Sequence, residues 1–235
     1  MITLVGVGHV FVISEQVRAM ILSRRPEAVW LELDPASNSA LRKREKRSAG
    51  RGPVQYMLLA RIQRRMASKF GSEAGAEMLA AASAAREIGA KVALIDMDAA
   101  KVFGKLWKVM TLKEKVELMF GSLVGLVASK ERVEEEMARY EEQDAEYIET
   151  LGADFPSVKR VLIDDRNQHM AARIASIASQ HGNVLAVVGD GHMQGLVEAL
   201  GDRPVETVRL KELRRSEPEQ ATTGGEYSFS YYVRQ

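Results

Sequence analysis

The sequence predicts an α/β protein: duplicated βαβ-type halves around a central, mainly parallel sheet, with a helical insert at about residues 99–149. Two observations predict this class. First, short apolar runs rich in β-branched residues alternate with segments of helical periodicity, as parallel strands require. Second, an apolar strand followed by Gly-x-Gly-His occurs twice, at 6–9 and at 189–192, which suggests an internal duplication. We expect one domain over residues 1–235.

The individual elements follow from periodicity and from helix-ending residues. We expect Ser14 to cap the first helix and Pro26 to end it, while Pro156 opens a long late helix. Residues 99–148 show only helical periodicity, and an alternating tail at 227–231 predicts an edge strand. The expected buried strands are 1–7, 28–33, 91–96, 184–188 and 205–208.

Composition excludes several classes of function. Lys+Arg (33) and Asp+Glu (32) nearly cancel, so no overall basic field favours nucleic acid. The absence of cysteine excludes disulfides, thiolate zinc sites and a cysteine nucleophile. The N-terminus lacks a signal-peptide pattern, and the longest apolar stretch, 118–128, is about half a membrane span. We therefore expect a cytoplasmic chain.

The paired Gly-x-Gly-His motifs carry the main functional hypothesis. If both strands lie in one parallel sheet, His9 and His192 meet at its carboxyl edge, where α/β proteins bind ligands. Glycines allow a tight strand exit and a close approach to the backbone. The alternative is two ordinary turns with locally hydrogen-bonded histidines. The pattern is not the dinucleotide fingerprint, so we expect no nucleotide cofactor. The motif glycines are Gly6, Gly8, Gly189 and Gly191.

Carboxylates follow other strands. Glu32 ends the second strand and Asp96 the third, and a buried carboxylate is costly unless it is paired, hydrogen-bonded or bound to metal. The alternative role for Asp96 is that of a helix N-cap. The alternative for Glu77 is a favourable interaction of its charge with the dipole of the helix in whose first turn it lies. Asp165 and Arg166 belong to a charged cluster that holds an oxyanion or, alternatively, forms a surface ion pair.

These segments together resemble the TraB family, which includes the pheromone-shutdown protein PrgY, archaeal TraB proteins and the Tiki proteases. The resemblance covers residues 4–195 and is closest to archaeal-type members. Two positions depart from the family pattern: Met97 stands where an arginine is usual, and Asp165 where a glutamate is usual. The matching segments are 6–10, 32–34, 75–78, 94–98, 165–167 and 188–192.

The resemblance implies a fold like that of erythromycin esterase and ChaN, and a metal-dependent peptidase site. It implies His9, His192 and Glu32 as the core metal site, with Glu77 and Arg166 as supports. We expect Glu32 and Arg166 to be catalytic, and Asp96 and Asp165 to be further supporting residues. Imidazole and carboxylate ligands suit Mn²⁺, Zn²⁺, Co²⁺ or Fe²⁺.

Two other readings stay open: a protein that sequesters a peptide or small ligand without chemistry, and an interaction module. We expect a homodimer through residues 99–149, where Gly121 and Gly125 form a Gly-x-x-x-Gly face. The alternative for this face is a buried helix. Longer family members carry C-terminal membrane helices, so we expect membrane attachment only in such longer chains.

Overall fold

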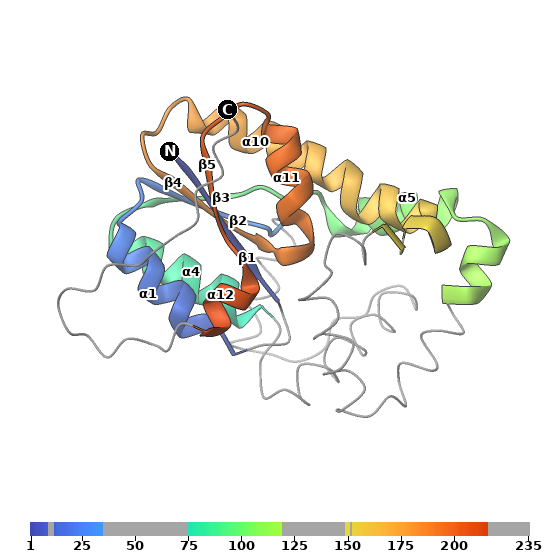
Figure 1. Ribbon diagram of the computed structural model, residues 1–235, viewed down its shortest axis with the longest axis horizontal. Coiled ribbons are helices and arrows are strands. Elements are labelled where there is room, and N and C mark those ends of the chain that lie inside the picture. Colours follow the sequence, from blue (N-terminus) through green and yellow to red (C-terminus); the bar gives the residue numbers. More distant parts are fainter. Residues whose placement is uncertain (9–11, 35–74, 119–148, 151, 216–235) are drawn as a thin grey trace.

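The computed structural model describes residues 1–8, 12–34, 75–118, 149–150 and 152–215. Its centre is a five-stranded sheet in the order β3-β2-β4-β1-β5, and every neighbouring pair is parallel. The predicted α/β class with a parallel sheet is therefore confirmed (Figure 1). The strands are β1 (Ile2–Val7), β2 (Ala28–Leu31), β3 (Lys91–Leu94), β4 (Val184–Gly189) and β5 (Val205–Val208).

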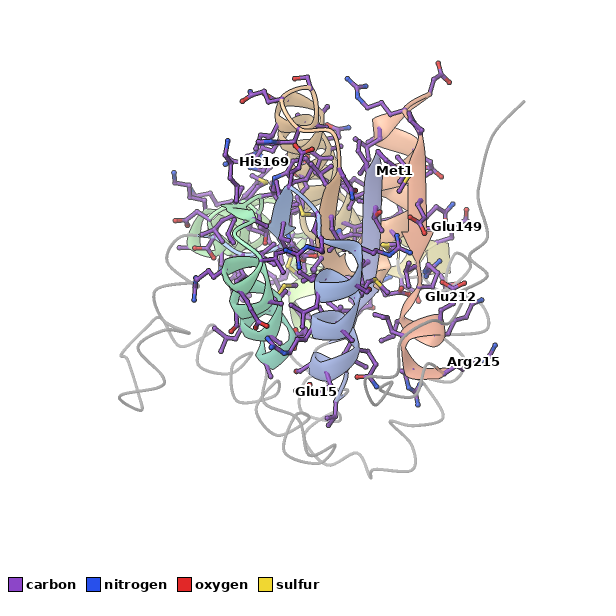
Figure 2. The ribbon with its side chains drawn as sticks, turned by 90° about the vertical axis from the view of Figure 1, so that its left-hand side faces the viewer. Met1, Glu15, Glu149, His169, Glu212 and Arg215 are labelled. Carbon is purple, nitrogen blue, oxygen red and sulfur yellow. The ribbon has the colours of Figure 1, made fainter. Side chains whose placement is uncertain are left out.

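The strands that precede the two Gly-x-Gly-His motifs are direct neighbours. β1 pairs with β4 along its whole length, with Ile2 opposite Val184 and Val7 opposite Gly189. The segments that leave these two strands therefore start at the same edge of the sheet. Figure 2 shows Met1, before β1, and Glu15, in the first turn of the next helix, toward opposite ends of the sheet.

Helices cover both faces of the sheet because its strands are apolar on both sides. On one face, Val5 and Val7 of β1 belong to a buried cluster with α1 (Ser14–Arg24), α4 (Ala76–Glu87) and α12 (Leu210–Arg215). On the other, Ile2 and Leu4 belong to a cluster with α10 (Asp165–Ala178) and α11 (Met193–Leu200). The result is a three-layer α/β/α arrangement (Figure 1).

The long late helix is interrupted just before the charged cluster. Pro156 begins α9 (Pro156–Lys159), as its fixed φ favours, and a π-helical turn, η1 (Arg160–Asp164), then leads into α10. Wide turns of this kind occur often at functional sites. A third apolar cluster joins η1 to α5 (Ala99–Val109), whose N-cap Asp98 accepts a hydrogen bond from the Lys101 backbone N–H (2.9 Å).

Two local expectations need correction. Ser14 is the first helical residue of α1 rather than its cap, because Ile13 occupies the N-cap position and makes no side-chain cap bond. β2 and β3 end at Leu31 and Leu94, so Glu32 and Asp96 lie just beyond the strands instead of within them.

Several expectations lie outside the described residues: His9, the face at Gly121 and Gly125, and the tail strand 227–231. Of the expected insert, α5 and a helix over residues 112–118 are described. Within the described ranges, no helix combines the length and the apolar character needed to cross a bilayer.

Candidate functional site

A group of polar side chains lies at the carboxyl edge of β2 and β4. Glu32 follows β2, Asp96 follows β3 and His192 follows β4, while Arg166 reaches them from α10. The helices that follow the adjacent strands β1 and β4 cover opposite faces, the topology at which α/β sheets commonly bind ligands. The structure thus brings together four of the residues that the sequence suggested.

Glu32 is at the centre of this group, and its side chain is 6% exposed. One oxygen, Oε1, accepts a hydrogen bond from Arg166 Nη2 (2.5 Å) and lies 3.3 Å from His192 Nε2. The other, Oε2, accepts from the backbone N–H of Gly189 (2.5 Å). Burial alone would raise the pKa of Glu32, but His192, Arg166 and the Gly189 N–H together hold it well below its usual value. Glu32 is therefore a carboxylate at neutral pH.

Arg166 ties two strand ends together. Its Nε donates to Asp96 Oδ1 (2.9 Å), and its Nη2 donates to Asp96 Oδ2 (2.8 Å) as well as to Glu32. Its Nη1 donates to the carbonyl of Leu162, in the π-helical turn (3.1 Å). Four of the five guanidinium N–H groups are thereby used within the protein. Arg166 chiefly positions Glu32 and Asp96; within the part of the chain that the structure describes, one of its five N–H groups has no acceptor.

His192 is held from the side opposite Glu32. Its Nδ1 lies 2.7 Å from Oδ1 of Asn167, which follows Arg166 on α10. Both residues are 5% exposed. Each ring nitrogen thus faces an oxygen: Nδ1 faces Asn167 Oδ1, and Nε2 faces Glu32 Oε1 at 3.3 Å.

Asp190, inside the second motif, has a structural role. Arg209 donates to it through Nε (2.9 Å) and Nη2 (2.6 Å), and the Leu210 backbone N–H donates as well (2.9 Å). Gly6 makes room for this carboxylate: a Cβ at that position would lie 2.2 Å from Asp190 Oδ1. The first motif thus needs its glycine because the second motif packs against it.

The remaining predicted residues do not join the central group within the described contacts. Asp165 pairs with Lys105 near the surface (2.8 Å), and Glu77 is buried in the first turn of α4. Met97 packs against the third apolar cluster. Gly189 lies close to the site, since a Cβ there would meet Glu32 Oε2 at 3.3 Å. Gly8 and Gly191 flank the same sheet edge.

Sequence reasoning missed three residues: Asn167, Arg209 and Gly195. Asn167 is a buried polar residue beside Arg166, and its position in a charged cluster of an otherwise apolar-faced helix was the available signal. Arg209 directly follows β5, and nothing in the neighbouring sequence indicates that it pairs with Asp190. Gly195 is recognisable only from the packing of α11 on α10.

A metal would find two suitable ligands among the described residues. No cluster of three or more His, Cys, Asp or Glu side chains in the described part of the chain is placed to hold an ion. The pair His192 Nε2 and Glu32 Oε1, separated by 3.3 Å, fits two ligands of one ion: bonds of about 2.0–2.1 Å at a tetrahedral angle separate two ligands by about 3.3 Å. Any third protein ligand would come from residues that the structure does not describe, and His9 is one of these residues.

The fold and this polar group define an α/β protein with a buried acid–imidazole pair at the carboxyl edge of its sheet. A model of the TraB/PrgY/gumN family matches residues 1–206, and the chain belongs to that family, as the motif resemblance predicted. One relative, an uncharacterized protein of Methanocaldococcus jannaschii, is 29% identical over 210 residues, which cover 85% of this chain and 53% of that protein. The chain thus spans about half the length of this curated relative.

A solved structure of ChaN from Campylobacter jejuni, described as showing cofacial heme binding, aligns with 88% of this chain and 80% of that chain. The TM-score is 0.37 and the sequence identity 14%.

Proposed function

We propose that the carboxyl-edge site is a divalent-metal site of a hydrolase that acts on peptides. The observation that carries the proposal is the orientation of His192: Nδ1 is held by Asn167 and Nε2 faces Glu32 Oε1 at 3.3 Å. Metal-binding histidines almost always donate their second ring N–H to such an outer partner. His192 and Glu32 are the proposed ligands, and His9 is the proposed third.

Each residue then has a distinct task. A bound Mn²⁺, Zn²⁺, Co²⁺ or Fe²⁺ ion would supply Lewis-acid polarisation of a peptide carbonyl and would lower the pKa of a water molecule. Glu32 stays ionised, and Arg166 fixes its Oε1 beside His192. The second N–H of Arg166 Nη1, which has no acceptor among the described residues, is the donor we propose for a developing oxyanion.

Metal binding can be tested without knowing the substrate. Tag-free protein is stripped of metal and titrated with Zn²⁺ by calorimetry, together with His192→Ala and the control His181→Ala. His181 is a suitable control because it lies before β4, near the opposite edge of the sheet, with Glu27 at 3.7 Å. We expect His192→Ala to lose more than about 100-fold in affinity, since losing a direct ligand exceeds the usual cost of losing an outer partner. Equal affinity in the wild type and His192→Ala would contradict the site.

A second function is supported by one observation. Both Glu32 oxygens and most Arg166 donors are already hydrogen-bonded within the protein, as in a rigid recognition site that performs no chemistry. Such a protein would sequester a peptide or small ligand. Incubating the metal-loaded protein with a mixed peptide pool and analysing it by mass spectrometry separates the two functions: hydrolysis gives fragments with new termini, whereas sequestration returns intact peptides.

The assembly and location of the protein are also proposals. We infer a homodimer formed through residues 99–149, a cytoplasmic chain, and membrane attachment only where a longer family member continues past this region. The supporting observations are helices at 99–109 and 112–118 that expose Trp107, Leu112 and Val116.

A further inference from the structure

We propose that an exposed surface on the helices after β3 binds the acidic residues 131–149 of a second copy of this chain, and that the dimer is formed by two such contacts, one in each direction. The inference deepens the proposed assembly and rests on the proposed homodimer for the identity of the partner. The surface, here called the arm surface, consists of Trp107, Leu112 and Val116 with the lysines of residues 99–118.

The helix over residues 112–118 is attached to the rest of the protein through a carboxylate. Glu114 is 3% exposed; its Oε2 accepts from the backbone N–H of Thr111 (2.8 Å) and its Oε1 from that of Ser157, at the start of α9 (2.8 Å). Leu112 and Val116 are four residues apart, hence on one side of the helix, and they are 78% and 58% exposed. An amphipathic helix usually buries its apolar side, whereas this helix is fixed with apolar residues directed outward.

Trp107 of α5 extends the apolar part of this surface. Its ring is 41% exposed, and Lys115 Nζ lies 5.4 Å from the ring centre, so the tryptophan adjoins the helix over residues 112–118. Figure 1 shows that helix (light green) at the side of the molecule farthest from α1. Exposed apolar residues that gather among polar ones mark sites of interaction with other molecules.

The charge of the arm surface indicates what kind of partner it fits. Residues 99–118 contain five lysines and two glutamates, a net charge of +3. Residues 131–149 contain nine acidic residues and two arginines, a net charge of −7. The same segment repeats apolar residues at the spacing of one helix side, at Val133, Met137, Tyr140 and Tyr147. Its composition therefore complements the arm surface in charge and in apolar character.

The symmetry of a dimer favours pairing between these two unlike regions. In a two-fold dimer, a region either meets its own copy or meets a different region of the partner twice. The arm surface against itself would bring +3 to +3, and residues 131–149 against themselves would bring −7 to −7, and both arrangements are repulsive. Reciprocal pairing of the arm surface with residues 131–149 is attractive in both contacts.

Charge-reversal variants of the full chain test this pairing. The surface variant carries Lys108→Glu and Lys113→Glu, both at exposed positions, and changes the net charge of residues 99–118 from +3 to −1. The segment variant changes the net charge of residues 131–149 from −7 to +1. It carries Glu134→Lys, Glu135→Lys, Glu141→Lys and Glu142→Lys.

The control variant carries Lys91→Glu and Lys211→Glu, on β3 and α12. Both lysines are exposed, and the total charge changes by the same amount as in the surface variant. Sedimentation velocity gives the dissociation constant of the dimer for the wild type, for each variant, and for an equal mixture of the surface and segment variants.

We expect the dissociation constant to rise by about tenfold or more in the surface variant and in the segment variant, because both contacts become repulsive. The control should stay within about twofold of the wild type, because its substitutions lie outside the interface. The mixture should form a heterodimer within about threefold of the wild type, since one contact keeps its original charges and the other has both charges reversed.

A mixture that associates no better than its two components would overturn the pairing, and so would a surface variant that dimerises like the wild type; the homodimer would stand in both cases. If the surface variant associates more tightly with the wild type than with the segment variant, the arm surface meets its own copy instead. A wild type that stays monomeric would remove the homodimer itself. Binding of that monomer, and not of the surface variant, to phosphatidylserine vesicles would assign the arm surface to an anionic membrane.

Discussion

Glu32→Gln is the most informative single substitution, because it keeps the shape of a buried side chain and removes its charge. Glu32 and Arg166 are 6% and 18% exposed, so solvent screens this pair little. Breaking a buried ion pair costs about 3–5 kcal/mol. Asp96 still neutralises the arginine, which lowers the cost. The new amide, however, offers one acceptor where Arg166 and the Gly189 N–H now have one oxygen each, and a buried donor without an acceptor costs about 1–3 kcal/mol.

We therefore expect the free energy of unfolding to fall by about 3 kcal/mol, measured by urea denaturation with circular dichroism. Glu198→Gln is the matched control: the Glu198 side chain accepts an exposed hydrogen bond from Gln194 (3.0 Å), and its change should stay within about 0.5 kcal/mol. A Glu32→Gln protein as stable as the control would refute the ion-pair reasoning. A large loss of stability with Zn²⁺ affinity unchanged would instead remove Glu32 from the metal site.

The same pair of proteins gives a pH test with a defined sign. The folded protein holds the pKa of Glu32 below its ordinary value of 4.5, so the unfolded chain takes up the proton first as the pH falls. The advantage of the wild type over Glu32→Gln is therefore complete at neutral pH. It should shrink as the pH is lowered from about 4.5 to about 3. A difference that stays constant over this range would show that Glu32 is not held as a carboxylate.

Two further predictions concern packing and assembly. Gly6→Ala should destabilise the protein by about 2–4 kcal/mol, because its Cβ would displace Asp190 from Arg209. The control Gly104→Ala, which places its Cβ in open space, should be neutral or stabilising by up to about 1 kcal/mol. Equal melting temperatures for the two variants would argue against a tight contact at Gly6. The full chain should have twice its 26.0 kDa mass by light scattering if residues 99–149 form a dimer contact, and a monomer over a wide concentration range would disprove the dimer.

Local physics made much of this protein predictable. β-branched apolar runs at 2–7 and 184–189 favour strands, and proline begins α9 because its φ suits a first helical turn. Glu32 could also be singled out, since a carboxylate beside a buried strand requires a partner. The family resemblance, confirmed over residues 1–206, added the order in which these segments belong together.

Tertiary structure decided which partners these residues found. The sequence left open whether Glu32 faces a metal or Arg166, and the structure places it 2.5 Å from the arginine, with His192 at 3.3 Å. Asn167 meets a histidine 25 residues away and depends on Gly195 for space. Such contacts depend on how closely two helices approach over a sheet. That distance is set by the combined packing of both helices and the strands beneath them, and no local stretch of sequence encodes it.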